Sequence, residues 1–374
     1  MNLKLICEPV DSSALWVTDI LDGAVHEAVK KELSVEVSTN GSPGDLPDQD
    51  SAHGIERRIV VVIGYSTGWI NETLTKLCEA NIEPILVSVC MYDLKREYSY
   101  VSFNTAEAMR NLVGYIHATG RQGIALFAVH RDTVGDRAKL NGFISGMRDS
   151  GMKFSREDIY YRGMVSECAE RLLENIKKYQ AVMCTSDLIA VYLTIFLRGK
   201  GIRVPEDINV TGFGNWKAIG AFSPSITRMY TDLTELGAQA VRLYIYMKNN
   251  PRTLHSTAIV QCQLQTGDST DSVPENDIRR FEPGFTLSES GAPLYNSDPD
   301  IIELLKLEPL VRNTDRLDTE ILRQICEDRP YAQISETLNI SESTIKYRLS
   351  KMQRTCGFRD RSELLEFVRK YGII

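Results

Sequence analysis

The stretch Leu338-Asn-Ile-Ser-Glu-Ser-Thr-Ile-Lys-Tyr-Arg-Leu-Ser-Lys-Met352 predicts a tight turn followed by an amphipathic helix. Ser341 can cap that helix, because the oxygen of an N-cap serine accepts a hydrogen bond from an early backbone N–H. Ile345, Leu349 and Met352 recur at helical spacing, so we expect them to point inward. The stretch therefore predicts the last helix of a helix-turn-helix.

Further helical patterns surround this turn. Ile321, Leu322 and Ile325 mark one amphipathic helix before it, and Ile334 marks a second, short one. A final helix is expected over residues 362–370. Residues 299–374 thus form a small all-α domain.

The outer face of the helix after Ser341 carries small polar and basic side chains. The candidates for DNA contact are Ser343, Thr344, Lys346, Tyr347, Arg348, Lys351 and Arg354. A helix that enters the major groove needs small polar groups near its start to approach base edges, and Lys or Arg to bind phosphates. Double-stranded DNA is the predicted partner. The alternatives are a solvated charged face on a dimerisation bundle, or a surface that binds a protein partner.

Two short motifs carry a family resemblance over about one-sixth of the chain. Thr344-Ile345-Lys346 is similar to the Thr-Val-Lys core of the LuxR-type recognition helix, and Gly357-Phe-Arg-Asp-Arg361 is similar to the segment that joins the family's last two helices. The first helix lacks the family's usual Arg-Glu pair, and Pro330-Tyr331 replaces a common glycine and small residue. The resemblance implies a bacterial DNA-binding regulator.

The charge distribution agrees with a DNA partner at this end of the chain. The whole chain of 374 residues has a net charge of −7, but from Ile340 onward eight Lys or Arg stand against four Asp or Glu. Polyanions are therefore expected to bind at the C-terminal end.

Upstream, short apolar runs alternate with longer helical patterns, which is typical of βαβ units with parallel sheets. Strands are predicted at 2–8, 58–63, 84–90, 99–103, 122–128, 158–162, 181–185, 208–213 and 225–230. Helices are predicted at 14–33, 69–80, 105–119, 135–150, 166–178, 187–199 and 232–249. The fold class is α/β.

Two segments rich in Gly, Pro, Ser and Asp interrupt this alternation. The first, residues 39–56, is expected to be a surface loop. The second begins at Gly267 and is expected to link two modules. The predicted domains are therefore a sensor at 1–266, a linker at 267–298 and the helical DNA-binding domain at 299–374.

The sensor carries blocks in a recognisable order. They are Asn104-x-x-x-Ala108, Gly120-Arg-Gln-Gly, Lys139-Leu-Asn-Gly-Phe, Ser186-Asp187-x-x-Ala190, Val204-Pro-Glu-Asp-Ile, and Pro224-Ser-Ile-Thr followed by Leu236-Gly-x-x-Ala240. This order resembles the effector-binding domain of the LacI/GalR repressors, which are relatives of periplasmic sugar-binding proteins. The resemblance implies two lobes with doubly wound parallel sheets, joined by crossing strands, with a small-molecule effector such as a sugar bound between them. Lobe closure would be the switch.

The same resemblance supplies candidate ligand contacts. They are Asp11, Ser12, Trp16, Ser66, Asn104, Lys139, Ser186 and Asp187. The chain departs from the family at three cleft positions, where Lys139, Ser186 and Gly214 replace the usual Arg, Asn and Asp. These departures weaken the case for a plain sugar.

Gly64-Tyr-Ser-Thr-Gly68 matches the nucleophile elbow of serine hydrolases, with Ser66 as the nucleophile. A hydrolase also needs a later histidine, and His255 is the candidate. A short pentapeptide arises often by chance, so we expect no catalytic residue and keep a serine esterase as the minor alternative.

The N-terminus, the apolar runs and the cysteine and histidine content narrow the class of protein further. The N-terminus shows no signal peptide, and no apolar run is long enough to span a membrane, so we expect a cytoplasmic protein with no membrane partner. The eight cysteines form no C-x-x-C pair and the five histidines are dispersed, which predicts reduced thiols, no metal site and no cofactor.

LacI/GalR repressors begin with their own DNA-binding domain, whereas this chain starts at the first sensor strand. We expect a homodimer paired through the sensor lobes, with residues 362–370 as a second candidate contact.

Overall fold

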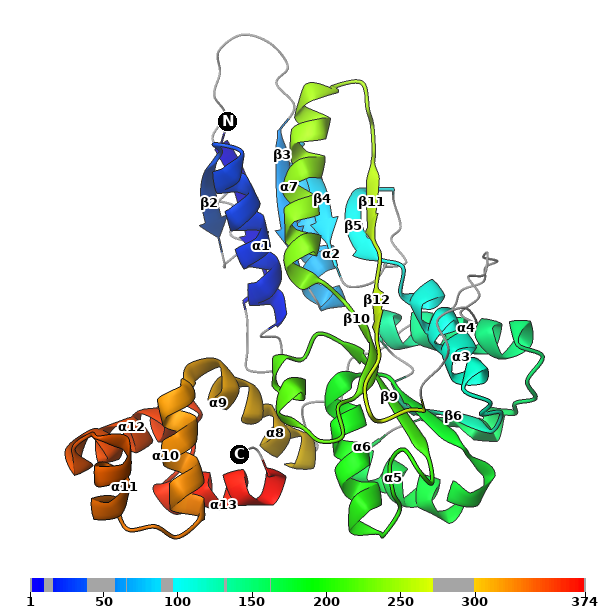
Figure 1. Ribbon diagram of the computed structural model, residues 1–374. Coiled ribbons are helices and arrows are strands. Elements are labelled where there is room, and N and C mark those ends of the chain that lie inside the picture. The colour runs from blue at the N-terminus through cyan, green and yellow to red at the C-terminus, as the bar shows by residue number, and fades with distance from the viewer. Residues whose placement is uncertain are drawn as a thin grey trace.

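The computed structural model describes residues 2–9, 16–38, 58–64, 66–88, 97–130, 133–161, 163–271 and 299–372. These residues form two α/β lobes and a helical module (Figure 1). Lobe 1 is uppermost in that view, lobe 2 lies below it, and the helical module lies beside lobe 2. The predicted fold class is confirmed.

Lobe 1 is built on a six-stranded parallel sheet in the order β11-β5-β4-β3-β1-β2. Its strands are β1 (Asn2–Cys7), β2 (Ser34–Ser38), β3 (Ile59–Ile63), β4 (Glu83–Val87), β5 (Ser99–Phe103) and β11 (Thr257–Val260). Helices α1 (Trp16–Lys30) and α7 (Leu233–Asn249) pack side by side on one face, and α2 (Thr67–Glu79) packs on the other. Because helices cover both faces, β3 is apolar and buried at every position.

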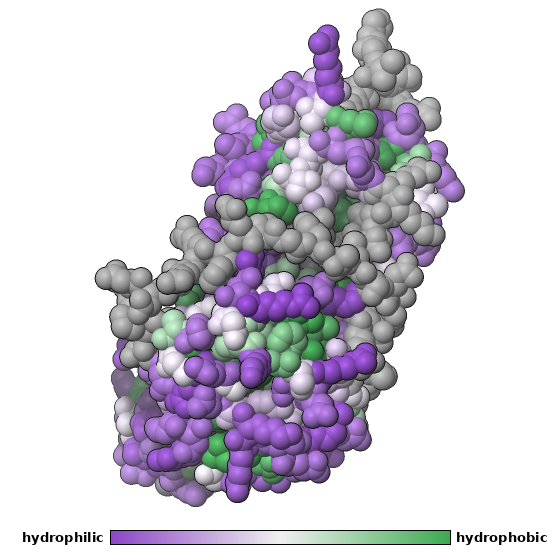
Figure 2. All heavy atoms as spheres, turned by 90° about the vertical axis from the view of Figure 1, so that its right-hand side faces the viewer, coloured by the Kyte–Doolittle hydropathy of each residue, from purple (hydrophilic) through white to green (hydrophobic). Residues whose placement is uncertain are grey.

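Lobe 2 repeats this plan with the order β12-β10-β9-β8-β6-β7. Its strands are β6 (Ile124–Val129), β7 (Ile159–Tyr161), β8 (Ala181–Cys184), β9 (Asn209–Gly214), β10 (Thr227–Tyr230) and the antiparallel β12 (Gln263–Gln265). Helices α3 (Thr105–Ala118) and α4 (Val134–Asp149) pack together, and α5 (Val165–Glu174) and α6 (Asp187–Gly199) belong to a second apolar cluster on the other face. Figure 2 shows that one side of the two lobes is mainly hydrophilic with small hydrophobic areas, as expected for covered sheets.

The chain crosses between the lobes three times. It passes from β5 to α3, returns from β10 to α7, and crosses again from β11 to β12. Sheets of both lobes are therefore completed by segments from distant parts of the sequence. Two lobes joined by crossing segments are the arrangement that the resemblance implied.

The predicted strands and helices of the sensor are all present, with shifts of a few residues at their ends. The structure adds β2, β11 and β12, which the sequence did not indicate. These three are edge strands with mostly exposed side chains, so they lack the apolar run that reveals a buried strand. The predicted loop at 39–56 lies outside the described residues.

The helical module has six helices in the part of the chain that the structure describes. They are α8 (Pro299–Leu305), α9 (Leu307–Asn313), α10 (Arg316–Cys326), α11 (Tyr331–Leu338), α12 (Glu342–Thr355) and α13 (Arg361–Tyr371). Asn339 ends α11 in the left-handed conformation with φ 53°, and Ser341 caps α12 through its side chain. The predicted helix, turn and helix are confirmed.

The module packs on lobe 2 through its first two helices. Ile301, Leu304, Leu307 and Leu310 are buried in the same apolar cluster as the α5 and α6 side chains. Helix α8 contacts α5 and α6, and α9 contacts the 3-10 helix η4 (Lys217–Ala221). Burial of this seam fixes the module against the sensor.

The sensor extends beyond the predicted boundary at residue 266. Gly267 donates its backbone N–H to Thr227 Oγ1 at 2.8 Å, and the Ser269 side chain is fully buried. Residues of the predicted linker that the structure describes therefore pack on β10, and the rest of that linker, residues 272–298, lies outside the described residues. Among the described helices, none combines the length and the apolar composition that a membrane crossing requires.

Substitution of Gly237 by alanine should destabilise lobe 1. A Cβ there would lie 1.9 Å from the Ile20 carbonyl oxygen, so α1 and α7 would have to separate. We expect a loss of about 1–3 kcal/mol in the free energy of unfolding. Urea denaturation of Gly237→Ala measures it, with Gly68→Ala as the control, because a Cβ at Gly68 meets open space. Equal stability of the two variants would contradict this packing.

Candidate functional site

The candidate ligand residues that the structure describes lie at the starts of helices or on α4. Ser66, Asn104 and Ser186 are N-cap residues of α2, α3 and α6, and Trp16 is the first residue of α1. Such positions follow the carboxyl ends of parallel strands, where polar ligands are commonly bound. Asp11 and Ser12 lie outside the described residues.

In lobe 1, Ser66 is held by a carboxylate that the sequence did not single out. Its backbone N–H donates to Glu8 Oε2 at 2.9 Å, and its hydroxyl donates to the other oxygen of Glu8. Glu8 itself is 6% exposed and directly follows β1. An acidic residue at the end of a buried apolar strand was the signal that could have revealed it.

Asn104 and Trp16 have more local roles in this arrangement. Asn104 is exposed and caps α3, accepting from the Glu107 N–H at 3.3 Å and donating to the Glu107 carboxylate. Trp16 is partly buried against the core of lobe 1. Their contact with a ligand stays a prediction.

In lobe 2, Lys139 joins the ends of three strands. Its ammonium donates to the Thr185 carbonyl at 2.7 Å and to Asp136 Oδ1 at 3.1 Å, and it lies 5.1 Å from the centre of the Phe213 ring. Asp136 in turn accepts the His130 N–H at 2.9 Å. The lysine is therefore fixed at the carboxyl edge of the sheet, and its contact with a ligand stays a prediction.

Asp187, the first residue of α6, is almost completely buried. Its Oδ2 accepts from Arg228 Nη1 at 2.8 Å and from the Trp216 backbone N–H at 3.1 Å, while Oδ1 has no hydrogen-bond partner in the described structure. Burial raises the pKa of the Asp187 carboxyl, and the Arg228 charge opposes that rise. An unpartnered buried oxygen is costly to retain unless a ligand or water completes it.

Glycines provide the space for this carboxylate. A Cβ at Gly212 would lie 2.7 Å from Asp187 Oδ1, and one at Gly214 would lie 3.6 Å from Oδ2. The charged partner of Asp187 is Arg228, from β10. Sequence reasoning missed Arg228, because the pairing spans 41 residues.

The geometry disfavours the esterase alternative. Ser66 follows the carboxyl end of β3, whereas His255 precedes β11, whose start pairs with Tyr100 of β5. The strands of this sheet are parallel, so the two residues lie at opposite edges, about 15 Å apart along strands of this length. A nucleophilic serine needs its histidine within hydrogen-bond reach.

The outer face of α12 is exposed as predicted. Ser343, Lys346, Tyr347, Lys351 and Arg354 are exposed, whereas Ile345, Leu349 and Met352 are buried on the inner face. Thr344 is half-buried and its hydroxyl lies 2.8 Å from that of Ser341 in the helix cap. The helix thus combines a fixed apolar face with a polar and basic surface.

Arg348 differs from the other candidates on α12. Its Nη1 donates to Asp315 Oδ2 and to Asp318 Oδ1, both at 2.8 Å, and its side chain is 27% exposed. Asp315 caps α10, so this arginine ties α12 to the start of α10. Its hydrogen bond lowers the pKa of the Asp315 carboxyl.

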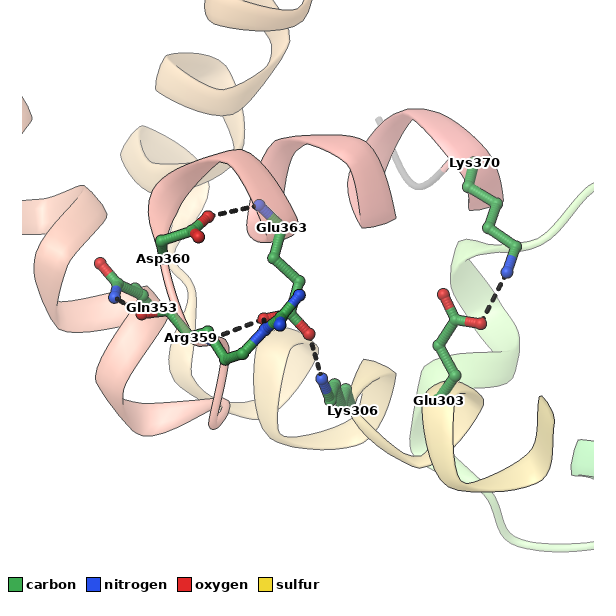
Figure 3. Close-up of polar contacts among 7 residues, drawn as sticks. All are labelled: Glu303, Lys306, Gln353, Arg359, Asp360, Glu363 and Lys370. Atoms are coloured by element: carbon green, nitrogen blue, oxygen red, sulfur yellow. Dashed lines mark hydrogen bonds and ion pairs between the residues drawn. The ribbon is translucent and has the colours of Figure 1, made fainter. Parts of the chain in front are cut away.

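Helix α13 packs against other helices of the module and forms ion pairs with residues of the module. Lys306 pairs with Glu363 at 2.7 Å and Lys370 with Glu303 at 2.6 Å, which joins α13 to the segment that contains α8 (Figure 3). Leu364, Phe367 and Val368 are buried within the module. The exposed positions of α13 are polar or charged.

Comparison with protein families finds two matches. Residues 113–270 match a periplasmic binding protein-like domain, and residues 316–368 match the luxR family of bacterial regulatory proteins. The transcriptional repressor PurR of Pasteurella multocida is 30% identical over 139 residues, which cover 34% of this chain and 40% of PurR. The uncharacterised regulator YvdE of Bacillus subtilis is 22% identical over 71% of this chain and 79% of its own length.

Solved structures share the fold of the two lobes. The transcriptional regulator CelR in complex with cellobiose has a TM-score of 0.58 at 18% identity, covering 72% of this chain and 84% of CelR. CcpA of Lactococcus lactis has a TM-score of 0.57 at 17% identity, covering 72% of this chain and all of CcpA. A LacI-family CcpA from Weissella paramesenteroides with bound glucose has a TM-score of 0.54 at 18% identity, with 72% and 98% covered. The chain thus joins two lobes, which share the fold of these regulators and include a match to a periplasmic binding protein-like domain, to a C-terminal helix-turn-helix segment that matches the luxR family of bacterial regulatory proteins.

Proposed function

We propose that this protein is a DNA-binding transcription regulator controlled by a small polar effector that binds between the two sensor lobes. The observation that carries the proposal is α12: its inner face is built into an apolar core, and its outer face exposes small polar and basic side chains in a segment that matches a DNA-binding family. The sensor matches a domain found in known regulators, and the helical module matches a family of bacterial regulatory proteins, so both support an effector-controlled regulator. A regulator of this kind acts in the cytoplasm, where its DNA lies.

The effector proposal rests on the polar groups at the carboxyl edges of the sheets. Ser66 and Glu8 come from lobe 1, and Lys139 and Asp187 come from lobe 2. Hydroxyl groups of a sugar or related metabolite can donate to carboxylate oxygens and accept from an ammonium group, and these edges carry both kinds of group. Closure of the lobes on such a ligand would favour one state over the other.

We propose a homodimer that pairs through the sensor lobes rather than through α13. The inner face of α13 is covered within the chain, and a contact through its outer face would bury Glu366 and Arg369. Such a dimer would place two copies of α12 about one turn of DNA, roughly 34 Å, apart.

An effector should raise the thermal stability of the protein. Binding to the folded state at about 100 times the dissociation constant stabilises it by roughly 2.7 kcal/mol. Thermal-shift measurements against sugars, sugar phosphates and nucleosides should yield a ligand whose shift is reduced in Ser66→Ala and Lys139→Met. A ligand whose thermal shift is unchanged in both variants would have to bind at another site.

Lys346→Ala should weaken DNA binding without affecting the sensor. Lys346 is exposed, with its ammonium 3.7 Å from Glu342 on the preceding turn. We expect about a tenfold loss of affinity for a duplex selected from a random library, and a smaller dependence on salt. Lys31→Ala, an exposed lysine after α1, is the matched control. Gel-shift binding equal to wild type, or retention on a protein but on no duplex, would contradict the DNA-binding proposal.

We propose that Arg348 stabilises the module rather than contacting DNA, so Arg348→Gln should lower stability. The variant loses two charged hydrogen bonds, which we expect to cost about 1–3 kcal/mol. The Asp315 pKa is depressed in the folded state, so its stabilisation is full at neutral pH and is lost as the pH falls below about 4. Urea unfolding should therefore separate variant from wild type at pH 7 more than at pH 3. A difference that grows with acid would contradict this role.

A further inference from the structure

One buried carboxylate contacts all three parts of the molecule. Asp19 lies in the first turn of α1 in lobe 1, and its side chain is 2% exposed. Its Oδ1 accepts from the Lys217 ammonium of lobe 2 at 2.6 Å. Its Oδ2 lies 3.3 Å from Arg312 Nη2 of α9, at the edge of the helical module.

We propose that Asp19, Lys217 and Arg312 form an ionic junction that couples the position of the two lobes to the restraint on the helical module. A change in the separation of lobe 1 from lobe 2 must stretch the Asp19–Lys217 pair, the Asp19–Arg312 pair or both. The inference concerns the motion of these parts, and it holds whichever ligand or partner the protein binds.

The burial of Asp19 makes the junction sensitive to movement. A carboxylate removed from water is stable only while its cations remain in place, and loss of one partner leaves an uncompensated charge. Arg312 cannot simply follow Asp19, because its guanidinium is also held by Glu308 of the same helix, at 2.9 Å. Lobe movement is therefore transmitted to α9 instead of being absorbed by one flexible side chain.

The junction is continuous with both candidate sites. On the sensor side, Lys217 directly follows Trp216, whose backbone N–H donates to the buried Asp187 carboxylate at 3.1 Å. On the other side, Arg312 is three residues before Asp315, the α10 cap that holds Arg348 of α12. Helix α9 also packs directly against both η4 and α12. These contacts form a continuous path from the Asp187 region of the sensor to α12, and the energetic coupling between the two ends of this path can be measured.

Hydrogen exchange of the full chain, followed by mass spectrometry, tests the junction without any ligand or DNA. The variants are Asp19→Asn, Arg312→Gln and the double substitution. Arg203→Gln is the matched control, because Arg203 pairs with Asp207 on the exposed surface of lobe 2. Circular dichroism establishes that each variant is folded, and Arg312→Gln, with a side chain 26% exposed, retains the test if Asp19→Asn does not fold.

Asp19→Asn should increase exchange about tenfold in peptides that cover α9 and the start of α10, far from the substitution in sequence, whereas Arg203→Gln should leave them unchanged. The double variant should exchange no faster than the faster single variant, because both remove the same junction. Faster exchange confined to α1 in Asp19→Asn, or effects of the two substitutions that multiply in the double variant, would overturn the proposal.

Discussion

Burial of one apolar seam determines how the parts of this molecule are related. Leu307 and Leu310 of α9, with Ile301 and Leu304 of α8, complete an apolar cluster that also contains side chains of lobe 2. Without this seam, the helical module would be held against the sensor mainly by polar contacts, such as that of Arg312 with Asp19. With it, α12 has a defined orientation relative to both lobes, and the polar contacts between module and sensor depend on that placement.

Much of the architecture could be predicted because its signals are local. The buried strand Ile59–Ile63 is an uninterrupted apolar run, and Ser341 with Ile345 and Leu349 encodes a capped amphipathic helix within a few residues. The strands that were missed, such as Thr257–Val260, are exposed edge strands whose place is set by pairing with a distant strand. Pairing across long separations leaves little trace in a local pattern.

In the candidate sites, too, local features could be predicted from the sequence and pairings between distant residues could not. Lys346 and Lys351 were correctly expected to be exposed on α12, because helical periodicity fixes which side faces the core. Arg348 lies on the same helix, yet its carboxylate partners are about 30 residues away and could not be inferred from spacing. Likewise, Asp187 was anticipated at the start of α6, but its pairing with Arg228 across the sheet was not. Side-chain pairing between elements is the part of a site that one sequence reveals least.

Helices α8 and α9 have a consequence for the construction of chimeric regulators. They precede the residues that match the luxR family, which begin at Arg316, yet their apolar side chains complete the surface of lobe 2. A fusion that exchanged the C-terminal domain just before Pro299 would pair this sensor with foreign adaptor helices and expose its apolar patch. A junction near Thr314 would instead keep α8 and α9 on their own sensor, so the part of this chain that can be exchanged begins after α9 and not at Pro299.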